Sequence, residues 1–183
     1  VQAFDARCKT IVIRSCAPAP LWSLLPKLNA EQPGMMVSSV ICQNDEVLAA
    51  LKDGSCDIGI LPFPLENGCE FMQENLFVCV PSEHELAHYE SLTFEEINGF
   101  NFLLRSELGF WDTLCREKMP ASKFFVQTAS DAFEELVKAS SLPCFSTDYG
   151  QNQCGVFSTR VNIPLSDDEA HVTFYITKYS PSI

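Results

Sequence analysis

The stretch "TIVIRSCAPAPLWSLLPKLNAEQPGMMVSSVICQNDEVLAALKDGSCDIGILPF" (residues 10–63) decides the fold. Short apolar runs alternate in it with segments of roughly 10 residues in which apolar side chains recur at helical spacing. We expect strands at Ile11–Ile13, Val37–Ile41 and Asp57–Leu61, and helices at Leu21–Ala30 and Asp45–Lys52. Strands and helices in alternation are typical of βαβ units around a parallel sheet.

The same order of elements returns between residues 100 and 147. The expected elements are, in chain order, strand Phe102–Leu104, a helix after Gly109, strand Phe124–Val126, a helix from Asp131 and strand Leu142–Phe145. Right-handed crossovers place the carboxyl ends of the strands and the amino ends of the helices at one edge of each copy. Two such edges that face each other form a cleft. The sequence therefore predicts two α/β lobes with the functional site between them.

Residues at the expected helix ends support this assignment. Asn44 and Ser130 are expected to cap the second helix of each copy, because their side chains can accept hydrogen bonds from free backbone N–H groups. Gly54 follows the end of the first of these helices, where a left-handed residue is common. Thr93 and Glu96 have the spacing of a capping box before a further short helix.

Composition and charge exclude several classes of protein. No apolar run approaches the roughly 20 residues that cross a bilayer, and the chain begins without a signal-peptide pattern. We therefore expect a cytoplasmic protein with no membrane partner. None of the nine cysteines forms a C-x-x-C pair, so we expect reduced thiols, no metal site and no cofactor. The net charge of −12 repels phosphate backbones, so this polypeptide is not expected to bind nucleic acid by itself.

Two stretches resemble a known family. They are "EVLAALKDGSCDIGILP" (residues 46–62) and "ENLFVCVPSEHELAHYESLTFEEINGFNFLL" (residues 74–104). In this order they are similar to the effector-binding domain of LysR-type transcriptional regulators, where a D-x-G-I strand precedes L-x-x-V-V-P-x-x-H-P-L-A. The resemblance extends from Lys9 to Pro181 and includes the Pro164-Leu165 segment before the last expected strand.

The resemblance implies the type 2 periplasmic-binding-protein fold, in which two Rossmann-like lobes are joined by two crossover strands. The first lobe is expected to comprise residues 1–80 and 157–183, and the second lobe residues 81–156. The crossover strands, acting as a hinge, are expected at Leu76–Val80 and near Gly155–Ile163.

The resemblance also implies the effector-sensing and dimerising part of a bacterial regulator rather than an enzyme. A small molecule would alter how an attached winged helix-turn-helix is presented to DNA. We expect that domain to be absent from this chain, with Val1–Arg7 as the end of its linker, so that DNA is bound only through the missing part. Family members pair through segments matched here by Leu21–Leu28 and Phe133–Val137, which predicts a homodimer or tetramer.

Arginines end the first strand of both copies, and a guanidinium can hold a carboxylate with two hydrogen bonds. Arg14 and Arg105 are each followed by serine near the expected cleft, although strand-end arginines also commonly point to solvent. Arg105 is taken as a ligand-binding candidate.

The family's loop after the first strand usually offers hydroxyl and N–H donors to the effector. Here it contributes the candidates Ser15, Cys16, Ala17 and Pro18. Few donors remain in it, since proline has no N–H, and this favours a carboxylate held by the other lobe or a fairly apolar molecule. Cys16 either lines the pocket or acts as a redox sensor. The other candidates follow strands and are also explained as caps, turns or core residues: Asn44, Phe63, Thr128, Phe145 and Thr147.

Three alternatives stay open. The sequence HELAH (residues 84–88) matches the H-E-x-x-H zinc-protease motif, but it follows a strand that ends at Pro81 and lacks an apolar helix around it. The sequence STRV (residues 158–161) resembles the T-R-F motif of prephenate dehydratases, with Val161 at the phenylalanine position. A solute-binding protein on the same fold would need an export signal.

Overall fold

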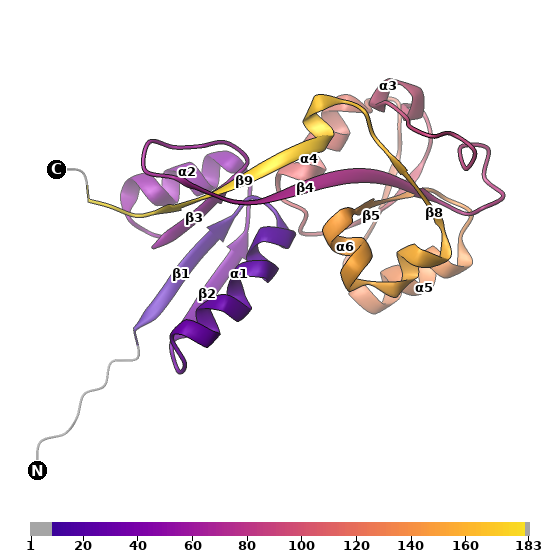
Figure 1. The fold of residues 1–183 in the computed structure, drawn as a ribbon. Coiled ribbons are helices and arrows are strands. Elements are labelled where there is room, and N and C mark those ends of the chain that lie inside the picture. The colour runs from indigo at the N-terminus through magenta and orange to yellow at the C-terminus, as the bar shows by residue number, and fades with distance from the viewer. Residues whose placement is uncertain (1–8, 182–183) are drawn as a thin grey trace, which may run out of the picture.

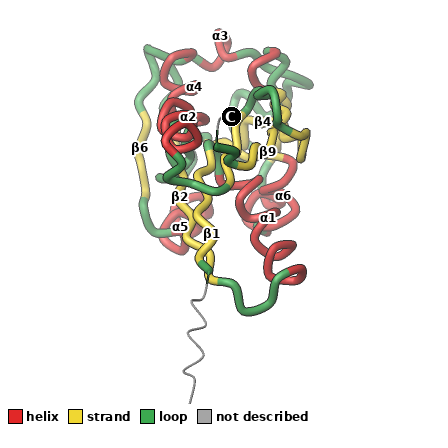
Figure 2. Tube along the Cα trace, turned by 90° about the vertical axis from the view of Figure 1, so that its left-hand side faces the viewer, coloured by secondary structure: helices red, strands yellow, loops and turns green. Residues whose placement is uncertain are grey.

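The computed structural model describes residues 9–181, and in it two lobes share one long strand, β4 (Figure 1). Val1–Arg7, which we predicted to be the end of a linker, lies outside the described residues. In Figure 2, α2 and α1 lie on opposite sides of β1 in the first lobe. The first lobe therefore has the layered arrangement expected for βαβ units.

The first lobe follows the expected order of elements. Its elements are β1 (Thr10–Ser15), α1 (Pro18–Glu31), β2 (Met36–Ile41), α2 (Asn44–Asp53) and β3 (Ile58–Leu61). The strands lie in the order β2-β1-β3 and all pair in parallel, with Ile13 opposite both Ser39 and Ile58. Helix α1 begins at Pro18, earlier than expected, because proline at the first helical position loses no hydrogen bond.

The second lobe repeats this arrangement. Its corresponding elements are β5 (Phe102–Arg105), α4 (Phe110–Lys118), β6 (Phe124–Gln127), α5 (Ser130–Ala139) and β7 (Cys144–Thr147). The strands lie in the order β6-β5-β7 and pair in parallel, as in the first lobe. Two short helices are added: α3 (Phe94–Ile97) and α6 (Asp148–Gln153). The duplicated topology expected from the sequence is thus confirmed.

Strand β4 (Cys69–Val80) belongs to both sheets. Residues 69–75 of it pair with β9 (His171–Lys178), and residues 76–80 pair with β7 and with β8 (Val161–Pro164). The chain returns from the second sheet to the first between β8 and β9, through a 3₁₀ helix at Asp168–Ala170. We propose that the lobes divide at these two places; the boundaries expected from the sequence stay a prediction.

The prediction of a strand near Gly155–Ile163 was wrong for the first half of this segment. Gly155–Thr159 forms a 3₁₀ helix, and only Val161–Pro164 is a strand. The Ser158 and Thr159 hydroxyls donate to the carbonyls three residues before them, at 2.7 Å each. Such local side-chain hydrogen bonds compete with an extended backbone, which explains the difference.

The helix caps differ from expectation by one residue at two places. Gln43, not Asn44, precedes α2, and its N–H donates to Glu46 Oε2 at 2.8 Å. Ala129 precedes α5, and the Ser130 hydroxyl instead accepts a hydrogen bond from Arg105. The capping box of Thr93 and Glu96 is confirmed.

The HELAH segment forms successive turns rather than a helix, with Ala87 N–H donating to the His84 carbonyl at 3.0 Å. The zinc-protease geometry needs both histidines on one helical face, so this segment does not provide it. Within residues 9–181 no cluster of three potential ligands is arranged to hold a metal ion. No helix in the described part of the chain is long and apolar enough to cross a membrane.

Arg160 stabilises the second lobe through backbone carbonyls. Its guanidinium donates to the carbonyls of Val137 (2.7 Å) and Ser140 (2.6 Å) at the end of α5, and to those of Leu142 (2.8 Å) and Cys79 (3.3 Å). A cation at a helix carboxyl end is also favoured by the helix dipole. The side chain therefore ties α5 to β4.

The variant Arg160→Met is expected to lower the free energy of unfolding by about 2 kcal/mol, because hydrogen bonds to a charged donor are lost and the carbonyls stay buried or half-buried. Urea unfolding measures this. The control is Arg116→Met, whose partner Asp112 lies on the exposed face of α4, and where a change below about 1 kcal/mol is expected. Equal effects of the two substitutions would contradict the assigned role of Arg160.

Candidate functional site

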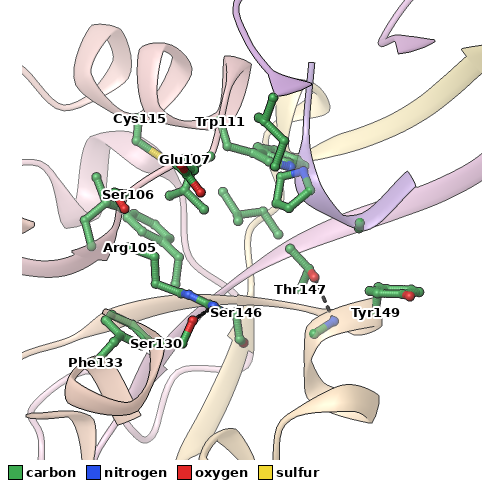
Figure 3. A pocket seen from close by; sticks show the side chains of 18 of the residues that line it. Arg105, Ser106, Glu107, Trp111, Cys115, Ser130, Phe133, Ser146, Thr147 and Tyr149 are labelled. Carbon is green, nitrogen blue, oxygen red and sulfur yellow. Dashed lines mark hydrogen bonds between the residues drawn. The ribbon is translucent and has the colours of Figure 1, made fainter. Parts of the chain in front are cut away.

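A cavity of about 210 Å³ lies between the lobes. The first lobe contributes the start of α1 and the end of β2, through Pro18, Ala19, Trp22 and Ile41. The second lobe contributes the ends of β5 and β7 and the starts of α5 and α6, and β4 forms part of the wall where it crosses between the sheets. Figure 3 shows Arg105 and Ser130 on one side and Thr147 and Tyr149 on the other.

Beside the cavity the lobes touch directly. The Phe110 N–H at the start of α4 donates to the Cys16 carbonyl at 2.8 Å. Gln43 Nε2 donates to the Gly109 carbonyl at 3.0 Å, and the Thr113 hydroxyl donates to Gln43 Oε1 at 2.7 Å. The strand and helix ends of the two copies therefore face each other, as the sequence predicts.

Gly109 permits this contact. A Cβ on this residue would lie 1.9 Å from the Cys16 carbonyl oxygen, far inside van der Waals distance. Its φ of 61° is also unfavourable for other residues. The close approach of the lobes thus depends on the absence of a side chain at one position.

Arg105 places a cation on the cavity wall. Its Nη2 donates to the Ser130 hydroxyl at 2.8 Å. The guanidinium carbon lies 5.8 Å from the centre of the Trp22 ring and 5.7 Å from that of Phe133. Among the carboxylates that the structure describes, none forms an ion pair with it. The remaining donors of the guanidinium can therefore bind an anion.

Glu74 places a carboxyl group on the same wall, at the point where β4 crosses between the lobes. Its residue is only 2% exposed, and Oε1 accepts a hydrogen bond from the Trp111 indole at 3.0 Å. Burial raises the pKa of this carboxyl to about 7, against the effect of its hydrogen bonds with Thr147 and Trp111. The group can thus be neutral or negative near neutral pH.

Five of the ten residues predicted for the site line the cavity: Pro18, Arg105, Thr128, Phe145 and Thr147. Phe145 also stacks on Phe102 with ring centres 4.6 Å apart, and Thr147 caps α6 by accepting the Gly150 N–H. Their part in ligand binding stays a prediction.

The other five lie outside the cavity lining: Ser15, Cys16, Ala17, Asn44 and Phe63. The first three are buried under the contact at Gly109, and the Ser15 hydroxyl donates to the Ala17 carbonyl at 2.7 Å. Burial raises the pKa of Cys16 well above its usual range, which disfavours a reactive thiolate. Asn44 has a buried Oδ1 without a hydrogen bond, in the first turn of α2.

Several lining residues were not predicted, above all Trp22, Glu74 and Trp111. Arg14, the other strand-end arginine, donates to the Ile13 carbonyl at 3.2 Å and does not line the cavity. Glu74 gives one sequence signal, an acid two residues before the apolar run at residues 76–80, but only the pairing of β4 with both sheets places it between the lobes.

Comparison with known proteins agrees with this geometry. The family described as "LysR substrate binding domain" matches residues 11–132. A relative, the Hca operon transcriptional activator HcaR of Escherichia coli, is 26% identical over 84 residues, which cover 44% of this chain. The matched stretch covers only 28% of the length of HcaR.

Solved structures share the fold. A full-length OxyR variant from Pseudomonas aeruginosa superposes with a TM-score of 0.69 at 16% identity, covering 96% of this chain and 65% of that one. The Synechocystis PCC6803 CcmR regulatory domain in complex with 2-PG superposes with a TM-score of 0.65 at 14% identity, covering 96% of this chain and 89% of that one. The BenM effector-binding domain with its effector benzoate superposes with a TM-score of 0.61 at 19% identity, covering 95% of this chain and 85% of that one. The fold is thus the two-lobe, periplasmic-binding-protein-like fold of these domains, and the chain belongs to the LysR substrate-binding domain family.

Proposed function

We propose that this chain is the effector-sensing part of a LysR-type transcriptional regulator and that the cavity between its lobes binds the effector. The observation that carries the proposal is a cavity walled by both lobes, with Arg105 on it and no carboxylate paired to that arginine among the described residues. The CcmR domain that shares the fold was solved in complex with 2-PG, and the BenM domain was solved with its effector benzoate, a carboxylate. These likenesses support a ligand that carries a carboxylate.

Binding in this position can alter the arrangement of the lobes. A molecule that contacts α1 on one side and Arg105 on the other stabilises whichever arrangement lets it make both contacts. The change is coupled to DNA binding through a winged helix-turn-helix that lies outside this chain, and the protein acts in the cytoplasm as a dimer or tetramer. Coupling of this kind requires different affinities of the effector for the two arrangements.

The rival function, a dehydratase on the same fold, has less support. Its motif arginine would be Arg160, which is engaged by four backbone carbonyls and is not among the cavity-lining residues. We therefore propose a sensor without catalytic activity, and a test of prephenate turnover checks this directly.

Thermal-shift screening of small acids and amino acids tests the proposed site. A bound compound at a hundredfold excess over Kd stabilises the protein by about 2.7 kcal/mol. Arg105→Gln is expected to weaken the binding of a carboxylate roughly 10- to 100-fold, because a charge-assisted hydrogen bond is lost. The matched control is Arg14→Gln, the arginine at the end of β1, which should bind as the wild type does. If Arg105→Gln keeps full affinity for every compound, the cavity is not the effector site.

A further inference from the structure

Two opposite charges on the wall of the cavity, those of Arg105 and the buried Glu74, do not meet, and a second carboxyl group on the wall, that of Glu107, is exposed. Arg105 and Glu74 both line the cavity, yet no ion pair joins them among the described residues. Glu74 lies next to the Trp111 indole, and Figure 3 shows Trp111 and Arg105 on separate parts of the wall. A ligand between them therefore meets a cationic and an anionic group at different points.

Among residues 9–181, Glu74 has no cation to balance its charge. No lysine, arginine or histidine in the described part of the chain pairs with this carboxyl group, which is 98% buried and hydrogen-bonded only to the uncharged side chains of Trp111 and Thr147 among those residues. The charged neighbour that acts on it is Asp148 at the start of α6, which repels its negative charge and raises its pKa. A buried carboxylate in such surroundings is unfavourable unless a cation is brought to it.

The wall between the two charges is largely apolar. Trp22 stands beside Arg105, and Phe133, Phe145 and Phe157 complete the surface on the side of the second lobe. The volume of about 210 Å³ is below the ~300–1,000 Å³ of pockets for drug-sized molecules, so the cavity suits a small ligand.

We propose that the effector is a zwitterion of the amino-acid class with an apolar or aromatic side chain. Its carboxylate is bound by Arg105, its ammonium group by Glu74, and its side chain by the aromatic wall. This inference rests on the proposed function, because it identifies the ligand of the same cavity. The proposed effector differs from a simple acid such as benzoate because its binding requires Glu74.

Calorimetric titration of the chain with four probes tests the proposal. L-phenylalanine and L-leucine carry both charges, whereas 3-phenylpropanoate and 4-methylpentanoate lack only the ammonium group. We expect at least one of the two amino acids to bind at least about tenfold more tightly than its deaminated counterpart. Glu74→Gln should abolish this preference, and Glu70→Gln, an exposed acid on the same strand, should keep it.

A second measurement uses only the wild-type protein and does not depend on how Glu74→Gln folds. Because burial raises the pKa of Glu74 to about 7, this carboxyl group is mostly protonated about one pH unit below that value, and an ammonium group that binds beside it there displaces the proton. Titrations in two buffers with different ionisation enthalpies measure the released proton. Binding of an amino acid without proton release would overturn the assignment of Glu74.

The outcomes separate this inference from the proposed function. If the deaminated acids bind as tightly as the amino acids and lose affinity in Arg105→Gln, the cavity is the effector site but the zwitterion proposal is wrong. If neither amino acid binds while another small acid does, the zwitterion proposal is likewise wrong and the proposed function stands. If no small molecule in the screen binds, both proposals fail.

Discussion

Replacing Gly109 by alanine is expected to separate the edges of the two lobes. The new Cβ would lie 1.9 Å from the Cys16 carbonyl oxygen and 2.6 Å from its carbonyl carbon, and neither backbone atom can move as a side chain could. The hydrogen bond from the Phe110 N–H to the same carbonyl cannot then form. The φ of 61° adds strain for any residue with a Cβ.

The expected loss in free energy of unfolding is about 2–4 kcal/mol, from a strained backbone position and a lost hydrogen bond. Urea unfolding measures the loss, and small-angle scattering should show a larger radius of gyration in the folded variant. Gly155→Ala is the matched control, because a Cβ there meets nothing within 4 Å. A Gly109→Ala variant with wild-type stability and dimensions would show that the lobes do not meet at this point.

Glu74→Gln is expected to change how stability depends on pH. The folded-state pKa of about 7 lies above the ordinary value of 4.5, so the folded chain holds the Glu74 proton more tightly than the unfolded chain does. The contribution of this group to the free energy of unfolding therefore falls as pH rises from about 4.5 through 7, and stays low above that. Glutamine has a similar shape and does not titrate.

Relative to the wild type, Glu74→Gln should thus gain roughly 2–3 kcal/mol of stability between about pH 5 and pH 8. Denaturant unfolding of both proteins at both pH values measures this difference. The contributions of the other titrating groups are the same in both proteins and cancel. Glu70→Gln on the exposed part of β4 should show almost no such change. A difference between Glu74→Gln and wild type that is independent of pH would mean that Glu74 titrates normally in the folded chain.

The sequence was sufficient to predict the repeated core of the fold because that information is local. Apolar periodicity and turn residues placed the five elements of each lobe, and the parallel order of strands followed from the handedness of crossovers. The prediction of Arg105 came from the same source, since the end of the first strand of each lobe must lie at the cleft edge. Only the direction of the side chain distinguished it from Arg14, and strand alternation does not resolve that when a boundary shifts by one residue.

The rest of the cavity depends on contacts between residues far apart in the chain. Glu74 reaches the cavity because β4 pairs with β9 up to Asn75 and with β7 from Leu76. The loop Ser15–Ala17 was expected in the cavity but is buried, because Gly109 from the other lobe lies against it. Neither arrangement has a local pattern that could have indicated it.

A crystal structure of this chain with the small acid or amino acid that most raises its melting temperature is the most direct measurement of where the effector binds. We expect the ligand between the start of α1 and the strand ends of the second lobe, with a carboxylate within hydrogen-bond distance of Arg105. A ligand bound outside this cavity, with Arg105 still bonded only to Ser130, would contradict this expectation.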